Sequence, residues 1–468
     1  MTDTGNVLHL VGAPTTFDLV LPPFTLEGGA QVAHHVVRGW HWGPREDEPV
    51  LRDRGIAAPD DDGQRLVTRS AGELAAMVRK APRVSERLSP EIPTVLVVHA
   101  LTGDARVGGP GGWWEPLIGP GRVLDPARRR VLCFNLLGSC YGTSGPADGS
   151  FPRLSDDAFP AELAPSRGGF AVPAVDLPAT VTTWDQARSI LMALDALGVS
   201  RVELLVGGSL GGMVALALAA LDPERFERLV PIAACAAASS WILAWNHVGR
   251  QAILADPGFP DDVGRGLELA RQVATITYRA EPGLDRTQGR RQGSDASGDW
   301  SSRARYRVQT YLEHQGQKLR ARFDARAYLT LIGAMDHHDL SRRPPPPEGA
   351  ESWPASVEPP PAARGPSLEP AAPRPTSWGL DRIRATTLAI GIDTDALYLP
   401  AHTDELVRQL TTRGVTARAE TISSHHGHDA FLTEWEQLAT HLATALALPA
   451  GRREDERSAG APGVQRSS

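Results

Sequence analysis

The chain has 468 residues, of which 41% are hydrophobic and 22% are charged, and its formal net charge at pH 7 is −7. This ordinary globular composition argues against nucleic acid and membrane surfaces as its main partners. The three cysteines, Cys133, Cys140 and Cys235, are odd in number and form no C-x-x-C pair, so we expect neither a disulfide framework nor a zinc site. No secretory signal pattern and no apolar run of membrane-spanning length is found, so we expect a cytoplasmic protein.

Strands and helices are predicted to alternate along the first half of the chain. Residues 24–43 read as a hairpin with a Gly-Gly turn. Residues 44–92 are charged, contain proline, and hold one short helix, AGELAAMVRKA, in a loop-rich stretch. β-rich apolar runs and helical periodicity then alternate, with strands at 94–100, 130–138, 203–206 and 228–236 and helices at 184–198 and 210–221.

The second half of the chain changes pattern. Residues 237–340 are helical, with apolar residues at three- and four-residue spacing in 306–340. Strand signals resume at 386–392 and 416–422, and an amphipathic helix follows at 430–448. Because strands alternate with helices, we predict an α/β fold with a mostly parallel sheet and helices on both faces. The helical block, inserted after about the sixth strand, is expected to lie over the carboxyl edge of the sheet as a lid.

Two segments have little apolar surface to bury. Residues 341–380 contain 12 prolines in 40 residues, and we predict a disordered or polyproline-like insert there. The tail at 450–468 is also predicted to be disordered. The predicted domain organisation is a core in two parts, 1–236 and 381–449, with a loop-rich insertion at 44–92, a helical lid at 237–340, the proline-rich insert and the tail.

The stretch LLVGGSLGGM, residues 204–213, places Ser209 between two glycine pairs. A buried strand precedes the serine and a helix follows it, so the chain must turn sharply where Cβ atoms do not fit. G-x-S-x-G in this setting is typical of a nucleophile elbow, which presents a serine hydroxyl at the carboxyl edge of a sheet. The helix N-terminus favours developing negative charge. We predict a nucleophile, against the alternative of a glycine-rich turn with an incidental serine.

Two C-terminal segments offer an acid and a base. Asp393 and Asp395 follow one buried strand, and His425, His426 and His428 follow the next. The chain order Ser…Asp…His is that of the α/β-hydrolase fold. From the residue types alone, the choice between the two aspartates and among the three histidines stays open.

The loop VVHALTGDA, residues 97–105, follows an earlier strand. In this fold the oxyanion hole combines a backbone N–H from that loop with the N–H of the residue after the nucleophile. We therefore predict the amides of Leu101 and Leu210 as donors. His99 is an alternative base, but its place at the strand end favours a role in anchoring the loop.

The sequence resembles the homoserine O-acetyltransferases of the α/β-hydrolase fold and their relatives that acylate serine or homoserine. The motifs that carry the resemblance cover most of the chain outside 44–92, 341–380 and the tail. They are HALTGDA (99–105), GGWWEPLIGPGRVLDPARRRVLCFNLLGSCYGTSGP (111–146), VGGSLGGM (206–213), ITYRAEPGLDR (276–286), YLEHQGQKLRARFDA (311–325), GIDTDALYLP (391–400) and GHDAFL (427–432).

The resemblance implies the remaining assignments. It makes Asp395 and His428 the partners of Ser209 in a triad, and it implies that Arg279 and Asp429 bind the substrate. An arginine can hold a carboxylate in a bidentate fork and an aspartate can hold an ammonium, as an amino acid requires. The implied reaction transfers an acetyl group from the co-substrate acetyl-CoA to the hydroxyl of L-homoserine, in methionine biosynthesis, with no metal and no bound cofactor. A homodimer formed through the lid is also implied.

Three features depart from the family pattern. Leu210 follows the nucleophile where methionine is usual, GSCYGTSGP replaces the commoner Gly-Gly-Cys, and Arg106 stands where histidine is frequent. Leucine at this position also occurs in succinyl-transferring relatives, but those resemble HALSGHHH and lack the arginine of ITYR, so the loops favour acetyl transfer. The sequence does not fix whether the acceptor is homoserine or serine, or whether the acyl donor is acetyl or succinyl. An esterase and a non-catalytic scaffold are further alternatives, and the lid, the Arg279–Asp429 pair and the complete triad argue against them.

Overall fold

The computed structural model describes residues 9–54, 56–57, 66–80, 87–153, 177–290, 305–346 and 377–451. Within them, nine strands form one sheet. In chain order they are β1 (Thr15–Leu21), β4 (His35–Trp42), β5 (Ile56–Ala57), β6 (Thr94–Val98), β7 (Arg130–Phe134), β8 (Leu204–Gly208), β9 (Arg228–Ile232), β10 (Thr386–Ile392) and β11 (Ala417–Ile422). A separate hairpin consists of β2 (Phe24–Thr25) and β3 (Gln31–Val32).

The sheet is parallel over most of its width and antiparallel at one edge. Its order is β11-β10-β9-β8-β6-β7-β4-β1-β5. The neighbours from β11 to β7 are parallel, whereas the pairs that involve β4, β1 and β5 are antiparallel. All residues of β6, β7 and β8 are buried, which is why these strands read as nearly continuous apolar runs.

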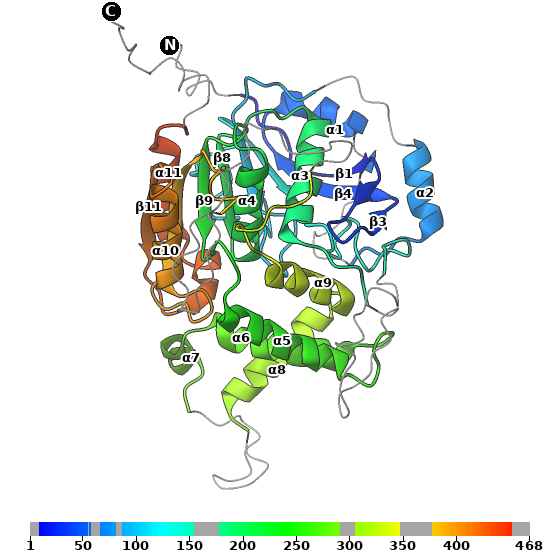
Figure 1. Ribbon diagram of the computed structural model, residues 1–468, viewed down its shortest axis with the longest axis vertical. Helices are drawn as coiled ribbons and strands as arrows, with labels where there is room; N and C mark the ends of the chain where they lie inside the picture. Colours follow the sequence, from blue (N-terminus) through cyan, green and yellow to red (C-terminus); the bar gives the residue numbers. More distant parts are fainter. Residues whose placement is uncertain are drawn as a thin grey trace, which may run out of the picture.

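The described helices outside the lid include several that pack on this sheet and α2, which lies apart from it (Figure 1). They are η2 (Arg45–Asp47), α1 (Glu48–Arg54), α2 (Ala71–Lys80), α3 (Thr183–Leu197), α4 (Leu210–Leu221), α10 (Pro400–Thr411), the 3-10 helix η7 (Gly427–Leu432) and α11 (Trp435–Ala447). Helix α4 is buried along its whole length and packs against α3, β6, β8 and β9. A helix that is apolar all round belongs in such a place. None of the described helices is long and apolar enough to cross a membrane.

In the described residues, five helices form the predicted lid between β9 and β10. They are α5 (Ser240–Leu254), α6 (Gly264–Tyr278), α7 (Glu281–Thr287), α8 (Arg307–Arg320) and α9 (Ala325–Asp336). Helix α6 packs against both α5 and α8, and α5 packs against α9. Figure 1 shows α5, α6 and α8 grouped beyond the end of the sheet, with α9 between them and the core. The insertion follows the strands that carry the predicted serine, as a lid over that edge requires.

Buried polar side chains fasten the lid to the core. His338, two residues beyond α9, is buried, and its Nδ1 lies 2.9 Å from the hydroxyl of Thr183 while its Nε2 lies 2.9 Å from the carbonyl oxygen of Cys235. Burial lowers the pKa of His338 to about 4, so the ring is neutral and serves as a hydrogen-bonding link.

The amino-terminal strand β1 is not predicted from the sequence. Its apolar run is interrupted by Asp18, a residue type that is depleted in strands. In the structure Asp18 is buried because Arg38 on the neighbouring β4 donates to it in a bidentate pair, at 2.7 and 2.9 Å. The strand therefore depends on a partner that local sequence does not reveal.

The predicted insert at 341–380 and tail at 450–468 lie largely outside the described residues. Residues 377–380 are described and buried, which corrects the prediction for the end of the insert. The ring of Trp378 lies 5.7 Å from that of Trp184 on α3 in an edge-to-face contact. The core therefore resumes before residue 381, at an aromatic contact between distant segments.

We expect Trp378→Ala to lower the free energy of unfolding by about 3–5 kcal/mol, because it removes a large buried side chain and leaves a cavity. Trp435→Ala is the matched control, since Trp435 is 40% exposed, and it should change stability far less. Denaturant unfolding of both variants measures the difference. Equal effects would show that Trp378 is not part of the core.

Candidate active site

Ser209 occupies a sharp turn between β8 and α4. Its backbone angles are φ 56° and ψ −125°, in a region that residues with a side chain rarely adopt. The residue is buried and directly precedes the first turn of α4. This is the strained geometry that a nucleophile elbow requires, and it places the Ser209 hydroxyl at the N-terminus of a helix.

The glycines around Ser209 are required by close packing. A Cβ atom on Gly207 would lie 2.3 Å from the carbonyl oxygen of Gly211, and one on Gly208 would lie 2.6 Å from the ring of Phe431. A Cβ atom on Gly211 would lie 2.2 Å from the carbonyl oxygen of Val98 at the end of β6. The glycines therefore let strand β8, helix α4 and the end of β6 approach one another at van der Waals distance.

His428 and Asp395 form a direct pair. The Nδ1–H of His428 donates to Oδ2 of Asp395 at 2.6 Å, and both side chains are buried. The other carboxylate oxygen of Asp395 accepts from the backbone N–H groups of Leu397 and Tyr398, at 2.8 and 2.9 Å. These bonds fix the carboxylate and thereby orient the imidazole.

Aromatic rings enclose the imidazole of His428. Tyr398 stacks on it at 5.1 Å, Tyr278 from the end of α6 lies at 5.5 Å, and Phe431 meets it edge to face at 5.7 Å. The Tyr398 hydroxyl lies 3.7 Å from Sδ of Met213 in the first turn of α4, and Tyr398 interacts with the side chain of Ser209. Ser209 and His428 therefore contact the same tyrosine, and the Ser209 hydroxyl lies at the ring system that contains the base.

Electrostatics favour a basic His428. Burial by itself disfavours the imidazolium, but the charge and hydrogen bond of Asp395, together with the charge of Asp429, outweigh it and raise the pKa of His428 above its usual 6.5. A base with a pKa near the working pH is suited to accept and return a proton.

The structure separates Asp395 and His428 from their rivals. Both carboxylate oxygens of Asp393 are engaged with Ser423 and Ser424, at 2.7 and 3.0 Å, so Asp393 stabilises the loop after β11. The rings of His425 and His426 lie against each other at 4.1 Å, both half-buried.

The predicted oxyanion donors lie where β6 and α4 meet. Leu101 and Leu210 are both buried. Among the hydrogen bonds between described residues, neither N–H has an acceptor. His99 accepts from the N–H of Leu136 with Nε2, at 3.0 Å, and its Nδ1–H donates to the carbonyl oxygen of Ala100, at 2.8 Å. Burial lowers its pKa to about 4, and both ring nitrogens are used to hold the loop.

Arg279 and Asp429 contact each other across the boundary between lid and core. Arg279 ends α6, and its Nε lies 3.4 Å from Oδ2 of Asp429, with the two side chains 26% and 19% exposed. This Nε has no hydrogen-bond partner among the described residues. Gly427, at φ +69°, permits the approach, because a Cβ atom there would lie 2.6 Å from the backbone nitrogen of Ala280. Both side chains are partly open to solvent, so the pair can receive a charged ligand.

The aromatic residues around His428 are not assigned roles by the sequence. Tyr398 falls within the motif GIDTDALYLP, three residues after Asp395, and this spacing is the one signal that could have indicated it. Tyr278 comes from the lid and Phe431 from η7, so their contact with His428 depends on the tertiary structure.

One described cluster offers ligand atoms of the kind that metals bind. These are His425, His426 and Glu434, whose ligand atoms lie within 4.8 Å of one another. A guanidinium nitrogen of Arg279 lies 3.4 Å from Nδ1 of His426. A fixed cation at that distance disfavours a second one, so the cluster does not suggest a metal centre.

Similar proteins have this fold. Residues 93–434 match the family model of the alpha/beta hydrolase fold. The homoserine O-acetyltransferase of Moorella thermoacetica is 37% identical over 366 residues, which are 75% of this chain and 85% of that protein. The crystal structure of homoserine O-acetyltransferase from Bacillus anthracis matches with a TM-score of 0.65 at 16% identity, covering 94% of this chain and 100% of the other. Esterase E22 matches with a TM-score of 0.63 at 18% identity, covering 93% and 100%.

The sheet, the serine elbow and the Asp–His pair define a protein of the α/β-hydrolase fold, as predicted. At such low identity the two structural likenesses show this fold alone, and it is shared by transferases and esterases. The sequence identity is more specific because it extends over most of both chains. The chain belongs to the homoserine O-acetyltransferase family, which confirms the resemblance seen in its motifs.

We expect the acylation rate to fall as the pH drops through the raised pKa of His428, because only the neutral imidazole can accept the Ser209 proton. The loss approaches about tenfold per pH unit below that pKa. Asp395→Asn removes the charge that raises the pKa, so the acid limb should move to lower pH while the rate drops by several orders of magnitude. The pH profile of kcat/KM measures both effects.

His425→Gln is the matched control for this profile. It changes a neighbouring histidine that lies against His426, and the acid limb should keep its position. If the acid limb moves in His425→Gln and stays in place in Asp395→Asn, the titrating group is not His428, and the prediction is wrong.

Proposed function

We propose that the protein transfers an acetyl group from acetyl-CoA to the hydroxyl of L-homoserine through an acetyl-serine intermediate, as a step of methionine biosynthesis. The observation that carries the proposal is the proximity of two pairs. The His428–Asp395 pair lies beside Ser209, and the Arg279–Asp429 pair is attached to the same loop, since Asp429 follows His428 directly. The His428–Asp395 pair is suited to activating Ser209 for covalent catalysis, and the Arg279–Asp429 pair is suited to binding the charged groups of an amino acid.

In the first half-reaction, Nε2 of His428 removes the proton of Ser209 as Oγ attacks the thioester carbonyl of acetyl-CoA. The oxygen of the tetrahedral intermediate is held by the N–H groups of Leu101 and Leu210, and each such donor contributes a few kcal/mol. The C–S bond then breaks, His428 returns the proton to the leaving sulfur, and coenzyme A departs. Ser209 is left as an acetyl ester.

In the second half-reaction, the hydroxyl of homoserine attacks this ester while His428 removes its proton. His428 then donates that proton to Oγ of Ser209 as the bond between Oγ and the acetyl carbon breaks, and O-acetylhomoserine is released. The guanidinium of Arg279 binds the carboxylate of homoserine, and Asp429 binds the ammonium. This is a ping-pong reaction in which one histidine acts in both halves and no metal takes part.

Hydrolysis is the competing outcome, because water can attack the same acetyl ester. The Arg279–Asp429 pair supports an amino acid acceptor, since an esterase needs no paired charges beside its base. Serine as the acceptor and succinyl as the acyl group remain alternatives. A single methylene changes selectivity by only about 1–3 kcal/mol, so small shifts in the pocket decide between homoserine and serine.

Two further features complete the proposal. A homodimer formed through the lid is supported by apolar side chains that α5 and α6 leave in solvent, with Trp241, Val248, Leu269 and Ile276 exposed by 46–50%. Large exposed apolar side chains on two helices that pack together are a feature of interfaces. A cytoplasmic location is supported by the three cysteines, which are buried and free.

We expect Ser209→Ala to fold normally and to lose acetyl transfer by several orders of magnitude, because the triad acts as a unit. Wild-type protein mixed with acetyl-CoA alone should gain one acetyl group on the peptide that contains Ser209. Mass spectrometry of both proteins measures this. Ser424→Ala, which changes a serine of the loop after β11, is the control and should still be acetylated at Ser209. Acetyl found on another residue would contradict the covalent route.

We expect Arg279→Ala to raise the KM for homoserine steeply and to leave the acylation burst with acetyl-CoA nearly unchanged. The reason is that the variant leaves the acceptor carboxylate unpaired, a loss of a few kcal/mol, without changing the first half-reaction. Rapid-quench measurements with acetyl-CoA alone, and then with homoserine, separate the two steps. Arg286→Ala, at an exposed arginine of α7, is the matched control.

Two outcomes of this experiment are decisive. A burst that falls as much as overall turnover would assign Arg279 to acetyl-CoA binding or to the structure of the lid. Release of coenzyme A at the same rate with and without homoserine, in the wild-type protein, would identify a hydrolase.

A further inference from the structure

We propose that Arg322, in the lid, is a positioning residue for the oxyanion-hole loop, so that placement of the lid sets how well the core stabilises the tetrahedral intermediate. The proposal rests on the proposed function, because it takes Leu101 as a donor of the oxyanion hole. Arg322 lies in the turn between α8 and α9 and is half-buried.

Arg322 makes two hydrogen bonds with one guanidinium nitrogen. Its Nη1 donates to the carbonyl oxygen of Thr102, at 2.8 Å, and to the hydroxyl of Tyr141. Thr102 directly follows Leu101, so the bond holds the backbone next to the predicted oxyanion donor. The neighbouring Phe323 packs edge to face on the Tyr141 ring, at 5.5 Å. A lid residue is therefore bonded to the loop that contains Leu101.

Tyr141 is also connected to the other end of this loop. Asn135 donates to the backbone carbonyl oxygen of Tyr141 and accepts from the backbone N–H of Ala105, both at 2.6 Å. The loop is thus held at Thr102 by Arg322 and at Ala105 by Asn135, and Tyr141 contacts both of these side chains. The turn at 100–103, closed by a bond from the N–H of Gly103 to the carbonyl oxygen of Ala100, contains Leu101 and the attachment at Thr102.

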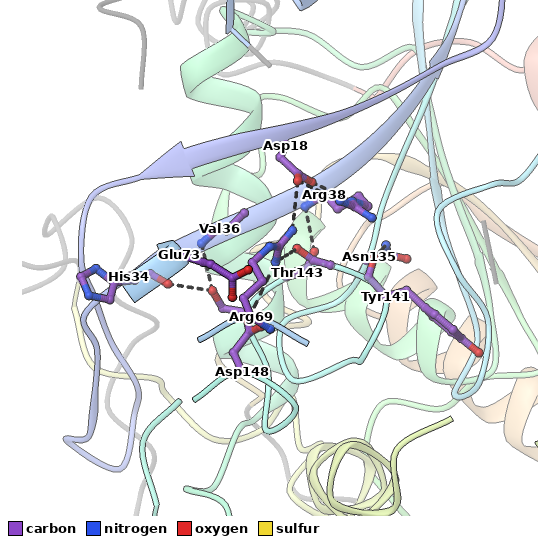
Figure 2. Close-up of polar contacts among 12 residues, drawn as sticks. Asp18, His34, Val36, Arg38, Arg69, Glu73, Asn135, Tyr141, Thr143 and Asp148 are labelled. Atoms are coloured by element: carbon purple, nitrogen blue, oxygen red, sulfur yellow. Dashed lines mark hydrogen bonds and ion pairs between the residues drawn. The ribbon is translucent and has the colours of Figure 1, made fainter. Parts of the chain in front are cut away.

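The segment that carries Tyr141 is itself fixed to the sheet. Figure 2 shows Arg38 and Arg69 both directed at Asp18, with Asn135 and Tyr141 on the far side of Arg38. Arg69 donates to the carbonyl oxygen of Gly142 at 2.7 Å, and the N–H of Arg38 donates to the hydroxyl of Thr143 at 2.9 Å. Because these groups are buried, the Tyr141 hydroxyl has a fixed position. Arg322 therefore has a rigid hydrogen-bond partner in the core.

Arg322 can be important for catalysis without being important for stability. The Thr102 carbonyl and the Arg322 side chain are half-buried, so water can replace the guanidinium as a donor when Arg322 is removed. What is lost is the constraint on the loop. A displacement of about 1 Å in a catalytic donor can reduce the rate about a hundredfold. We therefore expect the loss to appear in the step that forms the oxyanion.

The test compares Arg322→Met with Arg320→Met. Arg320 is two residues away, and its ion pairs with Glu268 and Asp262 stay within the lid, so its variant should behave like the wild-type protein. Arg322→Met should acylate Ser209 about 10–100-fold more slowly, with the melting temperature and the KM for homoserine nearly unchanged. Arg322→Lys should recover part of the rate, because an ammonium can still donate to Thr102.

A second readout is specific to the oxyanion hole. A trifluoromethyl ketone adds to Oγ of Ser209, whose proton goes to His428, and the ketone oxygen becomes the oxyanion. Its inhibition constant should rise in Arg322→Met by about the factor by which acylation slows, as for a transition-state mimic. Tyr141→Phe should give a smaller loss, and combining it with Arg322→Met should add little, since the two residues share one hydrogen bond.

Three outcomes would overturn the proposal. One is an acylation rate in Arg322→Met that equals that of Arg320→Met. Another is a rise in the KM for acetyl-CoA with kcat unchanged, which would make Arg322 a ligand contact. The third is slower acylation without weaker binding of the ketone. If Arg322→Met does not fold, Arg322→Lys and Tyr141→Phe provide the same comparison. Failure of the proposed function is distinguishable, because the wild-type protein would then form no acetyl ester at Ser209.

Discussion

The constraint on which the site depends is the close approach of three backbone segments at Ser209. The serine has a positive φ of 56°, and the flanking glycines touch Phe431, the end of β6 and the first turn of α4. Each contact leaves no room for a side chain. The predicted nucleophile, the predicted oxyanion loop and the loop that carries His428 are therefore positioned by the same contacts, and strain at one residue is stabilised by packing from three sides.

The second feature is the dependence of the predicted base, His428, on groups from distant segments. His428 donates to Asp395 from the end of β10, stacks on Tyr398, and meets Tyr278 from the lid. The charge of Asp395 overcomes the burial that would otherwise keep the imidazole from protonation. The aromatic rings exclude water, which strengthens that interaction. Burial therefore disfavours the charged form of His428 and also strengthens the attraction of Asp395 that favours it.

The lid contributes contacts to both halves of the proposed reaction. It supplies Arg279 at the end of α6, next to Asp429, and it supplies Arg322, which is bonded to Thr102. In the proposed reaction, acceptor binding and oxyanion stabilisation would both depend on the placement of the lid. The fold itself is shared with esterases. We therefore propose that these side chains, and not the sheet, decide between water and an amino acid as the acceptor.

The sequence by itself determined the parallel strands, the elbow at Ser209, and the order of serine, aspartate and histidine. Buried strands and a glycine-flanked turn are local patterns, and local sequence encodes them. It left Asp393 and Asp395 equal, because both follow the same strand, and the structure distinguished them by their hydrogen bonds. Other features depend on residues far away in the chain. Strand β1 depends on Arg38, the burial of Trp378 depends on Trp184, and one of the rings around His428 comes from the lid. Only the tertiary structure decides such contacts, because they require segments that meet after folding.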